Sequence, residues 1–76
     1  MDKKELQRVI GLRIKEVRLN KSMTQQGLAS ICDYEKSNMA RIEAGRTNIT
    51  IWTLFKLCEA LEVTLEEFFQ GLGDEQ

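Results

Sequence analysis

Apolar residues recur at helical spacing along almost the whole chain. The first apolar stripe proceeds in steps of four, four and three residues and consists of Leu6, Ile10, Ile14 and Val17. Such spacing places these side chains on one face of a long helix. The stripe ends in the polar segment 20–22, where we expect the first helix to stop.

Two shorter helices are predicted next, separated by a turn at residues 33–34. Thr24 precedes the second helix as an N-cap residue, and Gly45 stands where the third helix should stop. Ala29 is small enough to let the two helices cross closely. The side chains expected to point into the core from these helices are Leu28, Ala29, Cys32, Met39 and Ile42.

A loop over residues 46–49 leads to a fourth helix that begins near Thr50, and Thr64 with Glu67 forms a capping box for a fifth. The side chains expected to be buried are Ile51, Leu54, Phe55, Cys58 and Leu61 in the fourth helix and Leu65, Phe68, Phe69 and Leu72 in the fifth. Residues 74–76 read as a frayed tail. The pattern predicts an all-α domain of five helices over residues 1–73.

Composition restricts the functions open to these 76 residues. Hydrophobic residues make up 42% and charged residues 30%, as in ordinary globular proteins. No apolar run approaches the roughly 20 residues of a membrane span, and the N-terminus lacks a signal-peptide stretch. We therefore expect a cytoplasmic protein.

The chain has no His and only two Cys, Cys32 and Cys58. That composition removes imidazole bases and zinc sites that use His, and it leaves no C-x-x-C pair. We expect both cysteines to be reduced core residues. No catalytic site, metal, cofactor or small-molecule ligand is predicted.

Charge is unevenly distributed along the chain. Residues 1–56 carry all 11 basic side chains and a net charge of +5, whereas residues 57–76 carry six acidic side chains and no basic one. A local basic face is what nucleic-acid binding needs, so the overall net charge of −1 does not exclude it. A set of simply solvated helix faces would fit the same pattern.

Two short helices joined by a tight turn form the pattern of a helix-turn-helix, here in the segment TQQGLASICDYEKSNMARIEAG, residues 24–45. This segment resembles the phage Cro and repressor (XRE-type) helix-turn-helix family, and the resemblance extends over about residues 8–70. It implies a compact five-helix bundle of the lambda-repressor-like DNA-binding type. Asp33 stands where the family usually has Gly, and Glu35 where it usually has a Ser or Thr cap, so Asp33 is an alternative cap.

The resemblance makes the third helix the recognition helix, which enters the major groove of DNA. Its candidate base-reading residues are Lys36, Ser37, Asn38 and Arg41, with Asn38 open to a phosphate contact instead. The candidate phosphate-binding residues are Gln25 in the second helix and Arg46, Thr47 and Asn48 in the loop that follows the third. Arg13 and Lys15 are weaker candidates, because their positions depend on how the first helix packs.

Arg18 and Glu43 match family positions that form a partly buried ion pair between the first and third helices. A bidentate pair of this kind would hold the recognition helix against the first helix.

The sequence thus predicts a sequence-specific regulator of transcription that binds double-stranded DNA, on a palindromic operator, as a homodimer through the fourth and fifth helices. Controller proteins of restriction-modification systems, phage repressors and antitoxin-type regulators all fit this description. The alternative is a protein-interaction module that keeps the fold without strong DNA binding.

Overall fold

The computed structural model describes residues 1–73, and the predicted tail 74–76 lies outside them. Five helices follow one another: α1 (Lys3–Asn20), α2 (Gln25–Ile31), α3 (Lys36–Glu43), α4 (Ile51–Ala60) and α5 (Leu65–Gly73). Within this part of the chain no residue is in a strand, so the all-α prediction is confirmed. None of the described helices is both long and apolar enough to cross a membrane.

Local hydrogen bonds explain where the helices begin. The hydroxyl of Thr24 accepts from the backbone N–H of Gly27 at 2.9 Å, and Thr50 accepts from Thr53 at 3.1 Å. The predicted capping box is present, because the Thr64 hydroxyl accepts from the Glu67 N–H at 3.0 Å and the Glu67 carboxylate accepts from the Thr64 N–H at 2.9 Å. The hydrogen bond from the Thr64 backbone N–H to the carboxylate is the main cause that lowers the pKa of Glu67.

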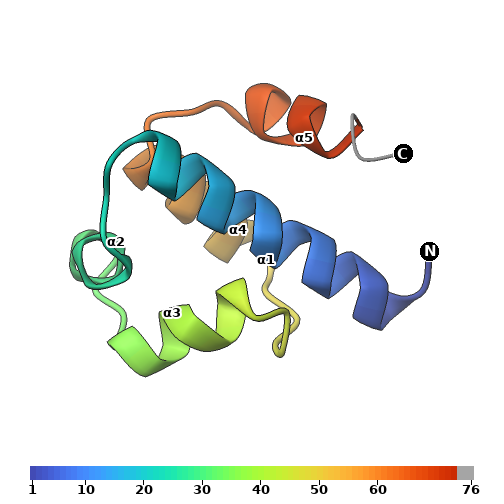
Figure 1. Cartoon of the computed structure of the whole chain (residues 1–76), viewed down its shortest axis with the longest axis horizontal. Coiled ribbons are helices and arrows are strands. Elements are labelled where there is room, and N and C mark those ends of the chain that lie inside the picture. Colours follow the sequence, from blue (N-terminus) through green and yellow to red (C-terminus); the bar gives the residue numbers. More distant parts are fainter. Residues whose placement is uncertain (74–76) are drawn as a thin grey trace.

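Helix α1 runs through the middle of the molecule, with α3 on one side of it and α5 on the other (Figure 1). Helices α2 and α3 contact each other as the predicted helix-turn-helix pair, and α4 contacts α2 and α5. The helices share one hydrophobic core, whose fully buried larger side chains are Ile14, Leu28, Met39, Leu57, Cys58, Leu61 and Phe68.

The predicted core of α4 is partly wrong. Ile51 is 81% exposed and Phe55 is 41% exposed, whereas Leu57, which the periodicity had not selected, is fully buried. The buried stripe is Leu54, Leu57, Cys58 and Leu61, at spacings of three, one and three residues. A helix turns only one stripe toward the core, so the other apolar residues of α4 stay on its outer face.

A similar correction applies to other predicted core residues. Phe69 is 46% exposed, Leu6 is exposed and Cys32 is only partly buried, while Phe68 and Cys58 are buried. Burial raises the pKa of the Cys32 and Cys58 thiols above the ordinary value of a cysteine, which favours the protonated, unreactive form.

Helices α1 and α3 approach closely at Gly11. A Cβ atom there would lie 2.5 Å from the carbonyl oxygen of Ile42 and 2.7 Å from that of Glu43. Both neighbours are backbone atoms, so no side-chain rotation could relieve the clash. The sequence analysis did not identify this glycine, because only the packing of the two helices makes it necessary.

Gly11→Ala is therefore expected to lower the free energy of unfolding by about 1–3 kcal/mol, although alanine is intrinsically the better helix former. Urea unfolding would measure this change. Gly27→Ala is the matched control, because its Cβ would meet only the side-chain hydroxyl of Thr24, at 3.0 Å. Equal stability of the Gly11→Ala variant and the wild type would contradict the close packing of α1 on α3.

Candidate nucleic-acid interface

The helix-turn-helix turn contains a residue in the left-handed conformation, Asp33, with φ of 59°. Aspartate tolerates this region better than most residues, which explains how the turn forms without glycine. Glu35 occupies the N-cap position of α3 in extended backbone, and no side chain makes a capping hydrogen bond there. Asp33 therefore does not serve as the alternative cap.

Tyr34 and Lys56 connect this turn to α4, a contact that the sequence analysis missed. The ammonium of Lys56 lies 5.0 Å from the centre of the Tyr34 ring and 6.0 Å from that of Trp52. Cation–π attraction of this kind is worth about 0.5–1 kcal/mol at exposed sites. No local motif joins these residues, so only the folded chain reveals the contact.

Helix α3 buries one face and exposes the opposite one. Met39, Ile42 and Glu43 are buried. The four candidate base-reading residues, Lys36, Ser37, Asn38 and Arg41, are all exposed. Since the buried side of α3 packs on α1 and α2, its polar side is free to meet a partner.

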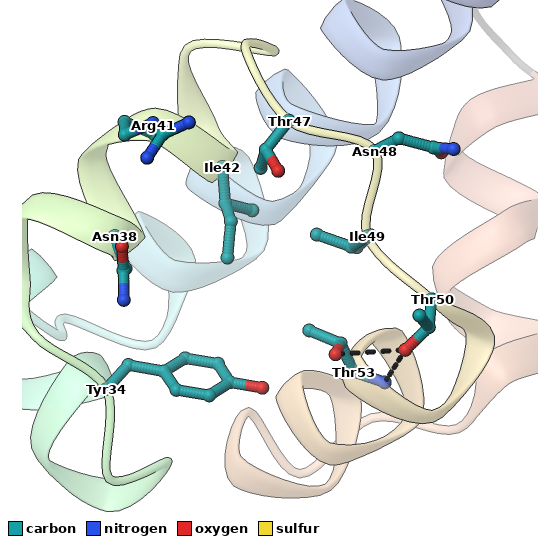
Figure 2. Close-up of a pocket in the computed structure, with 9 residues that line it drawn as sticks. All are labelled: Tyr34, Asn38, Arg41, Ile42, Thr47, Asn48, Ile49, Thr50 and Thr53. Carbon is teal, nitrogen blue, oxygen red and sulfur yellow. Dashed lines mark hydrogen bonds between the residues drawn. The ribbon is translucent and has the colours of Figure 1, made fainter.

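An open cleft of about 260 Å³ lies between α3 and the segment that leads into α4 (Figure 2). It brings together Asn38 and Arg41 from α3 with Thr47 and Asn48 from the loop. The remaining lining residues are Tyr34, Ile42, Ile49, Thr50 and Thr53. Two candidate base-reading residues and two candidate phosphate-binding residues thus share one surface, whereas Lys36, Ser37 and Arg46 are not part of this cleft.

The predicted ion pair between Arg18 and Glu43 is present and buried. Nε of Arg18 donates to Oε2 of Glu43 at 2.7 Å, and a second guanidinium nitrogen donates to Oε1 at 3.0 Å. Arg18 also donates to the carbonyl of Met23 at 2.8 Å. The hydrogen bond to Glu43 raises the pKa of Arg18 above its ordinary value, so the guanidinium stays charged.

Gln25 is part of the same network. Its amide nitrogen donates to Oε1 of Glu43 at 3.1 Å. The side chain predicted to bind phosphate is thereby held at the beginning of α2 by the pair that joins α1 to α3.

Arg13, a weaker phosphate candidate, faces α5 instead. It donates to the carbonyl oxygens of Phe68 at 3.0 Å and Glu67 at 3.1 Å, and it also pairs with Glu16. The absence of a side chain at Gly71 makes room for its guanidinium, since a Cβ there would overlap it. Arg13 therefore attaches α5 to α1 and does not belong to the α3 surface.

Comparison with known proteins finds a matching family profile and several similar proteins. A helix-turn-helix family profile matches residues 14–68. The chain is 31% identical over 65 residues to an uncharacterized HTH-type transcriptional regulator of Rickettsia conorii, covering 86% of this chain and 52% of the relative. It spans about half the length of this relative and of its Rickettsia prowazekii counterpart. Control protein C.BamHI of Bacillus amyloliquefaciens is 34% identical over 56 residues, covering 72% of this chain and 69% of the relative.

Solved structures with a closely similar fold are also found. The restriction-modification controller protein C.Esp1396I superposes with a TM-score of 0.86 at 34% identity, covering 92% of each chain. It has also been crystallised as a tetramer in complex with its natural 35 base-pair operator. The clp gene regulator ClgR of Corynebacterium glutamicum has the same fold, with a TM-score of 0.87 at 20% identity over 92% of this chain and 74% of that one.

Proposed function

The chain belongs to the helix-turn-helix family, and from this we propose that it is a transcriptional regulator that binds a specific double-stranded DNA sequence with α3 in the major groove. The observation that carries the proposal is the exposed polar side of α3 beside the loop 46–48. It offers side chains suited to base edges and to phosphates on one continuous surface.

The expected roles follow from the chemistry of the side chains. Lys36 and Arg41 can donate to guanine O6 and N7, Asn38 can pair with adenine, and Ser37 is adaptable. Arg46, Thr47 and Asn48 would donate to phosphate oxygens, as would Gln25 from the other side of α3. The Arg18–Glu43 pair would act indirectly, by holding α3 and Gln25 in position.

A second copy of the chain is the partner that we propose besides DNA. The α4 apolar face, defined as Ile51, Trp52 and Phe55, is exposed, and the rings of Trp52 and Phe55 stack at 5.8 Å. Phe69 adds exposed apolar surface on α5. Pairing these surfaces about a two-fold axis would bury them and present two α3 helices to a palindrome. The tetrameric controller protein on its operator is consistent with such assembly.

We further propose that residues 1–73 form a single helix-turn-helix DNA-binding domain, that the protein works in the cytoplasm, and that it acts by binding rather than by catalysis. The relatives named above as HTH-type transcriptional regulators support the last of these points.

Selection of bound sequences from a random duplex pool, at two salt concentrations, tests the proposal directly. We expect an inverted repeat with half-sites about 10 bp apart, because two recognition helices must reach one face of the duplex. A pool that stays random, with no salt-sensitive retention, would favour a protein-interaction module instead.

The two classes of DNA contact can then be separated by mutation. Lys36→Ala should cost about 1–3 kcal/mol of binding free energy on the selected site and relax the preference at one base pair. Arg46→Ala should weaken binding to every duplex by a similar factor and reduce the salt slope by about one per bound subunit. Titration of selected and scrambled duplexes measures both. If the two variants behaved alike, the assignment of base and phosphate contacts would be wrong.

A further inference from the structure

We propose that Arg8 and Lys15 on α1 bind a second phosphate strand of the DNA, on the opposite side of α3 from the loop 46–48. The inference rests on the DNA-binding function proposed above. It assigns a role to Arg8, which the sequence analysis had not selected, and gives Lys15 a defined position.

A second open cleft, of about 320 Å³, lies between α1 and the helix-turn-helix pair. We call it the α1 cleft; its lining residues are Arg8, Leu12, Lys15, Gln25, Ala40, Glu43 and Ala44. Arg8 and Lys15 stand seven residues apart on α1, which is close to two helical turns, so both project from one side of the helix about 10 Å apart. Gln25, already a phosphate candidate, lies in the same cleft.

The α1 cleft continues the exposed surface of α3. Lys36, Ala40 and the C-cap residue Ala44 follow one another at intervals of four, so they lie along one side of the helix. Lys36 is a candidate base-reading residue, and the two alanines beyond it border the α1 cleft. Asn38 and Arg41, by contrast, line the cleft toward α4. Helix α3 therefore has a cleft on each side.

The dimensions of DNA imply that both clefts face the phosphate backbone. The major groove is about 12 Å wide and a helix with its side chains is about 10–12 Å in diameter. A helix inserted in the groove therefore has a phosphate strand on each side. The loop 46–48 serves the strand on the α4 side, and the α1 cleft faces the strand on the other side.

Electrostatics favours a phosphate in the α1 cleft. Arg8 and Lys15 are exposed, and neither forms an ion pair with another residue among those the structure describes. The acidic residue of the cleft, Glu43, is buried and paired with Arg18, so it adds little repulsion. Ala40 and Ala44 have short side chains, which leaves room for the DNA backbone to approach the two cations.

The test is the salt dependence of binding to a labelled duplex, measured by fluorescence anisotropy between about 50 and 200 mM salt. Arg8→Gln and Lys15→Gln should each reduce the slope of log K against log[salt] by about one per bound subunit, and the double variant by about two. Selected and scrambled duplexes should lose affinity by the same factor. Thermal unfolding should not change, because both side chains are exposed.

Lys21→Gln is the matched control, since Lys21 is an exposed cation at the C-terminal end of α1 and does not line the α1 cleft. It removes the same charge and should leave the slope unchanged. If Lys21→Gln reduced the slope as much as Arg8→Gln or Lys15→Gln does, the effect would come from the long-range electrostatic field, and the proposal would be overturned. A wild-type slope in the double variant, together with a reduced slope in Arg46→Ala, would overturn it while the DNA-binding function stands. Salt-insensitive binding by the wild type would refute both.

Discussion

Glu43→Ala is expected to lower the free energy of unfolding by about 3–5 kcal/mol, the largest effect that we predict for a single substitution. The reason is the charge left behind. Arg18 is buried, and without Glu43 its guanidinium would keep the hydrogen bond to the Met23 carbonyl but lose both bonds to the carboxylate. Gln25 would lose its acceptor as well. Urea unfolding followed by circular dichroism measures the difference.

A double variant separates the cost of an unpaired charge from the value of the pair. Replacing buried ion pairs by apolar residues of similar volume is often neutral or stabilising. Arg18→Met combined with Glu43→Leu should therefore recover most of the lost stability, yet bind DNA more weakly because Gln25 is no longer held. An unchanged melting temperature in Glu43→Ala would show that the pair does not hold α3 in place.

Trp52→Ala is expected to weaken self-association by about 2–4 kcal/mol, or roughly 30- to 1,000-fold in the dimer dissociation constant. Trp52 is 64% exposed in the single chain and stacks on Phe55, so it presents a large, preorganised apolar surface to a partner. Sedimentation equilibrium over a range of concentrations measures the constant. Unfolding of the separated chain should change little, because an exposed side chain contributes little to the core.

Leu19→Ala is the matched control for this prediction. Leu19 is 56% exposed but lies on α1, outside the α4 apolar face. Leu19→Ala should leave the dimer dissociation constant unchanged. Trp52→Ala should in addition reduce the affinity for a palindromic operator, because the two half-sites would no longer be bound by one dimer. A wild-type protein that remains monomeric at high micromolar concentration, on and off DNA, would refute the proposed dimer.

Much of the fold could be predicted because its signals are local. Thr24 and the Thr64–Glu67 pair each act within one helical turn, and the structure shows both predicted caps. Thr50, near which the fourth helix was expected to begin, caps α4 in the same way. The side chains predicted to be buried were less well predicted, above all in the fourth helix. Its residues are apolar on more than one side, so periodicity could not decide that Leu57 would be buried and Ile51 exposed.

Some features of the candidate site could likewise be predicted from the sequence, and others could not. The Arg18–Glu43 pair could be predicted because the sequence carries both residues at the family positions that form it, and the structure shows the pair. The contacts of Arg13 with Phe68 and of Tyr34 with Lys56, by contrast, join residues far apart in the sequence. Such contacts have no local spacing to reveal them.

By itself, then, the sequence determined the helices, their caps, the helix-turn-helix segment and the polar residues on α3, since each depends on neighbours within a few positions. Only the tertiary structure decided which apolar face of α4 stays outside, why Gly11 must lack a side chain, and which α1 cations border α3 rather than α5. These features depend on the rotation and separation of packed helices. Helix positions are set by the shapes of all the side chains in the shared core, not by any one segment.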